Sequence, residues 1–252
     1  MRYFKFTFLL LTISFYANAQ SPEKVIGHYF KAIGGLDNWK KVETIEIKRH
    51  SIEKGNWSFI ERLFVLNGKG WRSESVVGQG SPSVMAVYEG KGREVNNLAG
   101  NLGAKSDGSR KKPISDMPDS TIKILQQRKY TLHNLANYQS KDVSLSLLGE
   151  FDNINGEKAI GIKIVSDDIE NDYFFSRKTH YLLRIKSGDR ETNYFKYKDV
   201  ENLKYPFEIE ARRYNTMHPH SNKTFTAIVT YEIDEVILNP KFEESIFLKP
   251  KN

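Results

Sequence analysis

The stretch 181-YLLRIKSGDRETNYFKYKDVENLKYPFEIEARR-213 decides the fold class, because apolar and charged residues alternate through three consecutive segments. In the first segment Leu183 and Ile185 share one parity, while Arg184 and Lys186 share the other. Successive side chains of a strand point to opposite faces of a sheet. The pattern therefore predicts antiparallel strands that bury one face and expose the other to water.

Strand signals continue on both sides of this stretch. The sequence predicts strands near 44–52, 57–66, 70–77, 84–88, 92–97, 143–151, 158–165, 171–176, 181–188, 191–199, 205–214 and 223–234. Their connectors, such as LNGKG, NINGEK and KSGDRE, are short and contain glycine, which is typical of hairpins. We therefore expect an antiparallel meander. A long loop near 98–118 and a helix near 119–130, capped by Asp119 or Ser120, interrupt it.

The adjacent glycines Gly34 and Gly35 raise the question of a phosphate-binding loop. That loop requires a strand before the glycines and a helix after them. Here a helix is predicted before them, because Ser21-Pro22 is a typical helix start and apolar residues recur at helical spacing up to Ile33. Gly34 is therefore predicted to end this helix as a left-handed C-cap. Asp37 is expected to cap a short second helix.

The composition excludes several classes of protein. The chain contains no cysteine, which rules out disulfides, cysteine catalysis and thiolate metal sites.

Residues 1–19, MRYFKFTFLLLTISFYANA, have the basic start, apolar run and small-x-small end of a secretory signal peptide cleaved after Ala19. Cleavage removes two basic residues, Arg2 and Lys5, and lowers the formal net charge from +7 to +5. We therefore expect an exported protein that does not bind nucleic acid.

No catalytic, metal or cofactor site is predicted. His218 and His220 lie in a proline-interrupted hairpin tip without a third ligand nearby, so a solvated loop explains them better than metal binding. The acidic run SDDIEND, residues 166–172, lacks the spacing and the glycine of an EF-hand. No G-x-S-x-G motif occurs. Nothing selects one carboxylate pair for glycosidase chemistry from the 31 acidic residues.

The order of these segments resembles the LolA/LolB-like superfamily of outer-membrane lipoprotein-sorting proteins. The first motif is AIGGLDNWKKVETIEI, which begins at the end of the first helix. The second lies in the later half of the chain, where two strands joined by a K-T turn are followed by Y-K-D-V and then by L-K-Y-P-F. Ser176-Arg177, where Asp-Pro is commoner, and the insertion near 98–118 depart from the pattern. The resemblance implies a mainly β fold, a single highly curved antiparallel sheet or half-open β-barrel with two or three α-helices covering its concave face. One domain, 20–252, would follow the signal peptide.

The resemblance also implies a periplasmic carrier, with neither enzymatic activity nor a cofactor, that buries lipid acyl chains in outer-membrane lipoprotein sorting or envelope lipid transport. Each CH₂ group left in water costs about 0.8 kcal/mol, and a barrel of roughly ten strands has room for a ligand. The expected partners are lipid or lipoprotein acyl chains, with transient contacts to a membrane or to envelope proteins, and the protein is expected to be a monomer. The residues expected to line the cavity are Leu183, Ile185, Phe195, Tyr197, Phe207, Ile209, Phe225 and Val229.

Two other interpretations remain open from the sequence. An exported hydrolase could use the same curved sheet, in which case polar side chains should converge in the cavity. An envelope-assembly scaffold would instead have a filled core, because alternation alone does not distinguish a cavity wall from a packed interior.

Overall fold

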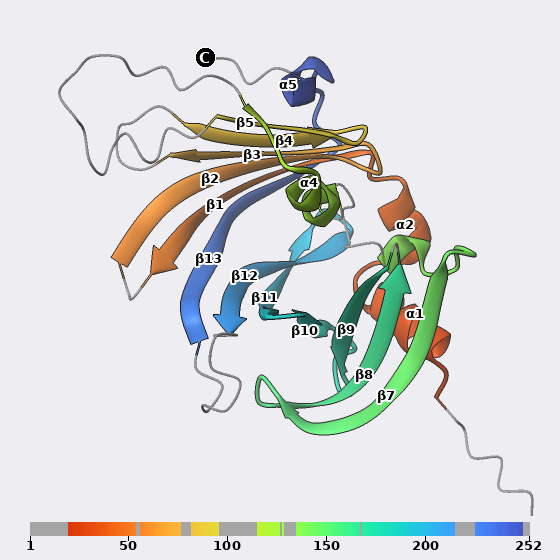
Figure 1. Cartoon of the computed structure of the whole chain (residues 1–252). Helices are drawn as coiled ribbons and strands as arrows, with labels where there is room; N and C mark the ends of the chain where they lie inside the picture. Colours follow the sequence, from red (N-terminus) through yellow and green to blue (C-terminus); the bar gives the residue numbers. More distant parts are fainter. Residues whose placement is uncertain are drawn as a thin grey trace, which may run out of the picture.

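The described residues form one sheet of 13 antiparallel strands, which curves strongly but does not close (Figure 1). The structure is a computed structural model, and it describes residues 20–53, 56–76, 82–95, 115–126, 128, 135–166, 168–214 and 225–248. The strand order is β6-β5-β4-β3-β2-β1-β13-β12-β11-β10-β9-β8-β7. The predicted fold class, a mainly β half-open barrel, is confirmed.

The two halves of the chain build the two sides of the sheet. The first half contains β1 (Thr44–Glu53), β2 (Asn56–Leu66), β3 (Gly70–Val76), β4 (Ser83–Tyr88), β5 (Lys91–Val95) and β6 (Ser115–Asp116). The second half contains β7 (Val143–Ile154), β8 (Glu157–Ser166), β9 (Ile169–Ser176), β10 (Leu182–Ser187), β11 (Arg190–Val200), β12 (Leu203–Tyr214) and β13 (Phe225–Leu238). Because β13 pairs with β1, the halves meet at the centre of the sheet and β6 and β7 form its edges.

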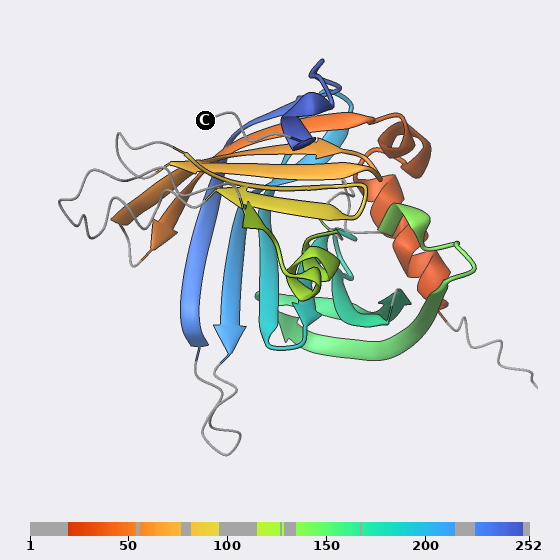
Figure 2. The ribbon, with the colours of Figure 1, turned by 45° about the horizontal axis from the view of Figure 1, so that its top comes forward.

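Short helices lie on both sides of the sheet (Figure 2). On the concave side are α1 (Pro22–Ala32), α2 (Leu36–Lys40), α4 (Asp119–Gln126) and the 3-10 turn η2 (Leu135–Asn137). On the outer side α5 (Ser245–Leu248) packs against β3 and β4 through Phe247. Among the described helices, none has the length and apolar character needed to span a membrane.

One main core joins the concave helices to both halves of the sheet. Ile26 of α1, its C-cap residue Ile33 and Trp39 of α2 are fully buried in it. The Tyr29 ring lies 5.3 Å from that of Phe175 on β9. Fully burying one such side chain contributes roughly 1.5–3 kcal/mol. The helices are therefore anchored on the sheet by their apolar faces.

Gly34 ends α1 as predicted, with a φ of +107°. The Gly35 amide donates to the Phe30 carbonyl at 2.7 Å and the Gly34 amide to the Lys31 carbonyl at 3.5 Å, which is the hydrogen-bond pattern of a Schellman motif. The predicted cap at Asp37 is wrong, because α2 begins at Leu36, directly after Gly35. The glycine pair is a helix-to-helix turn, as the sequence indicates.

All the predicted strands are present, with shifted ends. The largest extension is in β13, which continues to Leu238 instead of ending near 234. Asp119 is the first residue of α4, so the predicted cap at Asp119 or Ser120 is wrong by at least one position. The short strand β6 and the helix α5 are not predicted from the sequence. Most of the expected loop near 98–118 lies outside the described residues.

Candidate ligand-binding cavity

The concave face of the sheet contains a cavity of about 280 Å³. Strands β1 to β3 form one wall and strands β9 to β13 the other, so residues far apart in sequence face each other across it. The described lining residues are Ile45, Ile47, Arg49, Leu63, Val65, Trp71, Arg128, Asn171, Tyr173, Ile185, Ser187, Arg190, Thr192, Tyr194, Tyr205, Ile209, Ala211 and Tyr231.

Five of the predicted lining residues lie on the concave face. Ile185 and Ile209 line the cavity directly. Tyr197 and Phe207 are half-buried beside it and pack against the main core. The Tyr197 hydroxyl donates to the Leu182 carbonyl at 3.0 Å, which fixes its ring. Val229 pairs with cavity-lining Ala211 across β12 and β13, and cross-strand partners share a face.

Leu183 lies on the opposite face, so its predicted place in the lining is wrong. A β-bulge interrupts the pairing of β9 and β10 between Leu182 and Arg184. A bulge adds one residue to a strand and changes which side chains face inward. Leu182 therefore joins the main core, whereas Leu183 packs with Phe174 in a separate small cluster on the outer side. The regular alternation of apolar and charged residues in the sequence gives no indication of this bulge.

Phe195 is also on the outer face, and its predicted place in the lining is wrong as well. Its neighbour Tyr194 lines the cavity, and adjacent strand residues point to opposite faces. Lys196 then has a φ of +53°, which turns the strand so that Tyr197 returns to the concave side. In the segment NYFKYK the two residues on the concave side are thus Tyr194 and Tyr197, three residues apart.

Several predictions cannot be compared with this geometry. The side chain of Phe225 and the signal peptide at 1–19 lie outside the described residues. The same holds for His218 and His220. Within the described ranges no group of three or more histidine and acidic side chains is arranged to hold a metal ion.

The polar part of the cavity is not anticipated by the sequence analysis. Three arginines line it, Arg49, Arg128 and Arg190. Arg49 is ion-paired with Glu61 of β2, and its Nε donates to the carboxylate at 2.6 Å. Its guanidinium carbon also lies 3.8 Å from the centre of the Tyr231 ring. The sequence could have predicted that Arg49 faces the cavity, because it follows Ile45 and Ile47 at the two-residue spacing of one strand face.

Tyrosines surround the apolar part of the cavity and stay neutral at physiological pH. Burial raises the pKa of Tyr205 to about 12. Burial also raises the pKa of Tyr173 and of Tyr194 above the ordinary value of tyrosine. These rings therefore contribute apolar surface and neutral hydroxyl groups, and not negative charge.

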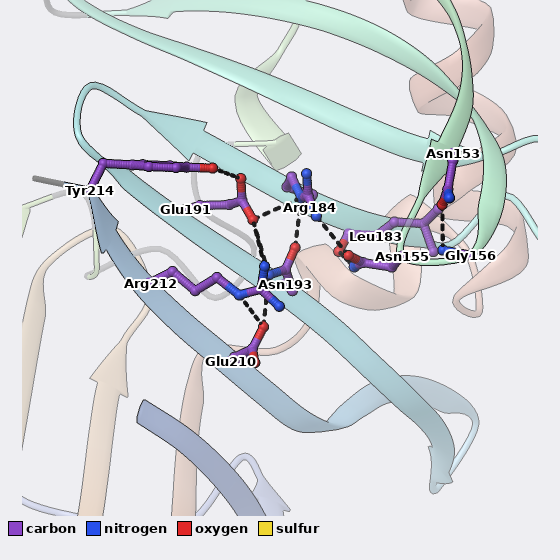
Figure 3. A network of polar contacts seen from close by, with 10 residues as sticks. All are labelled: Asn153, Asn155, Gly156, Leu183, Arg184, Glu191, Asn193, Glu210, Arg212 and Tyr214. Atoms are coloured by element: carbon purple, nitrogen blue, oxygen red, sulfur yellow. Dashed lines mark hydrogen bonds and ion pairs between the residues drawn. The ribbon is translucent and has the colours of Figure 1, made fainter. Parts of the chain in front are cut away.

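A second polar cluster lies on the face opposite the cavity (Figure 3). At its centre the buried amide of Asn193 donates to Glu191 at 3.3 Å and to Glu210 at 3.1 Å. Arg184 donates to the oxygen of Asn193 at 2.7 Å and to Asn155 of the β7–β8 turn at 2.8 Å. Asn155 also donates to the Leu183 carbonyl at 2.8 Å, so the cluster ties the β7–β8 turn to β10 and β11.

The cavity combines an apolar wall with guanidinium groups. Its described lining contains no carboxylate, imidazole or thiol. Nucleophilic catalysis requires a nucleophile and a base within hydrogen-bond reach, and Ser187 and Thr192 have no such base among these residues. The arrangement is suited to holding an apolar chain and a negatively charged group.

These features define a class of protein: a half-open antiparallel barrel with a cavity on its concave face, where helices also pack. The chain is similar in structure to a LolA superfamily protein from Nitrosomonas europaea, with a TM-score of 0.54 and 6% identity, over 91% of this chain and 98% of that chain. The chain therefore has the LolA-like fold, as its motifs indicate.

Two further solved structures show weaker similarity. A DUF1329 family protein from Desulfovibrio piger has a TM-score of 0.46 and 10% identity, over 90% of this chain and 97% of that chain. The lipoprotein LppX from Mycobacterium tuberculosis has a TM-score of 0.30 and 10% identity, over 88% and 99%. No protein-family model and no curated protein matches the sequence.

Proposed function

We propose that this protein is a periplasmic, non-enzymatic binding or carrier protein that buries lipid acyl chains in the cavity of the half-barrel. The cavity carries the proposal. Ile45, Ile47, Leu63 and Val65 form a continuous aliphatic wall on β1 and β2, and Ile185 faces them from β10. An apolar wall of this kind is what an acyl chain in water requires.

The free energy available is large enough for a carrier. Each CH₂ group transferred from water to an apolar site contributes about 0.8 kcal/mol. The volume of about 280 Å³ is close to the lower end of ligand cavities, roughly 300 Å³. The cavity therefore suits one chain segment better than a long chain or a second chain.

The two alternatives fit this geometry less well. A hydrolase was expected to bring polar side chains together in the cavity, and three arginines do converge there. The described lining nevertheless supplies no general base, which hydrolysis by a serine or threonine would need. A scaffold was expected to have a filled core, and an accessible cavity of this size does not favour that interpretation.

The cellular role follows from the carrier proposal. Residues 1–19 would direct export and be removed after Ala19, leaving a periplasmic monomer. The carrier would exchange its chain with a membrane or an envelope protein, in lipoprotein sorting or in envelope lipid transport. The fold shared with a LolA superfamily protein supports this placement.

Acyl-chain binding can be tested with cis-parinaric acid methyl ester, a neutral probe that fluoresces in apolar sites. The mature protein should bind it with saturation. Ala211→Phe should weaken binding about 10-fold or more, because the ring fills space that several CH₂ groups would occupy. Thermal unfolding should show that the variant is folded.

Ile228→Phe is the matched control for this experiment. Ile228 lies on the neighbouring strand β13, is 44% exposed and pairs with Arg212 on the outer face. The same new side chain there should leave probe binding unchanged. No binding to the unsubstituted protein, or equal losses in both variants, would contradict the carrier proposal.

A further inference from the structure

The charges of the cavity do not balance among the described residues. Arg49, Arg128 and Arg190 line it. Glu61 is ion-paired with Arg49, and Asp189, which is ion-paired with Arg213, lies near Arg190. An isolated charge is costly to keep in an apolar environment unless it is paired. Counting Arg213 with the three lining arginines, four cations face the two carboxylates Glu61 and Asp189, which leaves a local excess of positive charge.

Arg49 is the cation that Glu61 neutralises. The Glu61 side chain is 7% exposed and accepts hydrogen bonds from Arg49 and from the Ser73 hydroxyl on β3. The pair is fixed further by the Tyr231 ring against the Arg49 guanidinium. Arg49 and Glu61 therefore form a neutral unit in the wall and have little capacity for another ion.

Arg128 has no carboxylate partner among the described residues. Its guanidinium lies over the Trp71 ring, 5.2 Å from the ring centre, and its side chain keeps accessible surface because it faces the cavity. Burial among protein atoms lowers the pKa of Arg128, and the positive charges of Arg49 and Arg190 lower it further, against the opposing effect of Glu61. An arginine stays protonated despite such shifts, so this position holds a charge that a bound anion would stabilise.

Arg190 supplies the second unpaired charge. It is the first residue of β11, is exposed, and lines the cavity on the same face as Thr192 and Tyr194. No ion pair of Arg190 with a carboxylate occurs among the described residues, whereas its cross-strand neighbour Arg213 is bound to Asp189. Asp189 also lies near Arg190, but the hydrogen bond of this carboxylate goes to Arg213, so the Arg190 guanidinium is available to a ligand.

The charged and apolar parts of the cavity lie at different positions along the strands. On β1 the sequence of inward residues runs from Ile45 through Ile47 to Arg49. Four residues of a strand span about 13 Å. Tyr205 marks the helix-covered end, because its ring lies 6.5 Å from that of Trp39 in α2. Along β1 an elongated ligand thus meets hydrocarbon near the helices and the Arg49 guanidinium farther along, while Arg128 reaches over Trp71 beside the apolar wall.

We propose that the cavity selects a single-chain amphiphile with an anionic headgroup, whose carboxylate or phosphate oxygens are held by Arg128 and Arg190. This inference rests on the proposed function and narrows it to a ligand class. Guanidinium groups bind such oxyanions through charge-assisted hydrogen bonds, which are stronger than neutral ones. The volume of about 280 Å³ favours one chain over two.

The test compares cis-parinaric acid with its methyl ester, which share the same chain and differ in the headgroup, a carboxylate in the acid and a neutral ester in the other. At pH 7.5 the acid should bind roughly 10- to 100-fold more tightly than the ester, the range expected for one hydrogen-bonded charge. Arg128→Gln and Arg190→Gln should each reduce that preference, and the double variant should abolish it. The affinity of each variant for the ester is the reference from which its preference is calculated.

Arg177→Gln is the control, because Arg177 is exposed in the β9–β10 turn and pairs with Glu150 at 2.6 Å. It should keep the preference for the acid. Displacement of the bound acid by lysophosphatidic acid and by lauric acid then identifies the preferred headgroup, phosphate or carboxylate. Both competitors belong to the proposed class.

The outcomes separate this inference from the carrier proposal. Equal binding of acid and ester would overturn the headgroup site and leave acyl-chain binding intact. Binding of neither probe would overturn both. If inorganic phosphate bound in calorimetry while neither probe did, the site would serve a free anion, which also contradicts an amphiphile.

Discussion

At the scale of single residues, arginines in the same cavity have different surroundings. Arg49 has a buried carboxylate partner in Glu61, whereas Arg128 has an aromatic ring beneath it and two other cations nearby. Breaking a buried ion pair leaves the remaining charge uncompensated. Removing an unpaired charge relieves repulsion instead. Stability measurements should therefore distinguish a structural arginine from one kept for a ligand.

We expect Arg49→Gln to lower the free energy of unfolding by about 3 kcal/mol, because Glu61 would stay buried without its cation. Arg128→Gln should change it by less than about 0.5 kcal/mol, or raise it slightly. Urea unfolding followed by circular dichroism measures both variants. Equal destabilisation would mean that Arg128 also has a structural partner.

At the scale of elements, the end of α1 is more tightly constrained than the sequence indicates. A Cβ atom on Gly34 would lie 2.6 Å from the Asn202 carbonyl and 2.8 Å from Leu203 Cδ2, at the start of β12. The Ile33 carbonyl accepts hydrogen bonds from the Lys204 amide and from the Trp39 indole, each at 3.0 Å. The glycine thus ends the helix and also lets it contact the sheet closely.

Gly34→Ala should therefore lower the free energy of unfolding by about 2–4 kcal/mol, from backbone strain and a backbone clash together. Gly27→Ala is the matched control, because Gly27 is in the same helix and has nothing within 4 Å of an added Cβ. That change should stabilise the protein by roughly 0.5–1 kcal/mol. Thermal or urea unfolding compares the two. A Gly34→Ala variant as stable as the Gly27 variant would refute the close contact.

At the scale of the whole molecule, α1 contacts the second half of the sheet through a pair of histidines. The rings of His28 on α1 and His180 in the β9–β10 turn lie 5.0 Å apart. His28 Nδ1 is buried without a hydrogen-bond partner among the described residues. Burial lowers the pKa of His180, and the neighbouring His28 lowers it further. Protonation of His180 is therefore unfavourable while α1 is in place.

This pair predicts a dependence of stability on pH. The folded protein binds a proton at His180 less readily than the unfolded chain, in which the pKa of histidine is about 6.5. The free energy of unfolding should therefore fall as pH decreases below about 6.5. His180→Asn should reduce that slope between pH 7.5 and 5.5, and asparagine tolerates the φ of +62° at this position. An unchanged slope in urea unfolding would assign the effect to other groups.

The sequence by itself determined the strands, the turns and the end of the first helix. Period-two alternation, hairpin glycines and a C-cap glycine are local signals, and each depends on the backbone of a few neighbouring residues. The LolA-like fold also followed from short motifs, such as the turn that contains Gly34 and Gly35. Ile185 and Ile209 were correctly placed on the inner face for the same reason.

Only the tertiary structure decided which side chains meet in the cavity. The bulge beside Leu183 and the positive φ of Lys196 each changed the face of a predicted lining residue, because one irregular residue reverses the alternation that follows. Arg128 and Arg190 come together with Arg49 only because β13 pairs with β1 and curves the two halves around one space. Their shared charge depends on distances across the sheet, and the linear order of residues does not contain those distances.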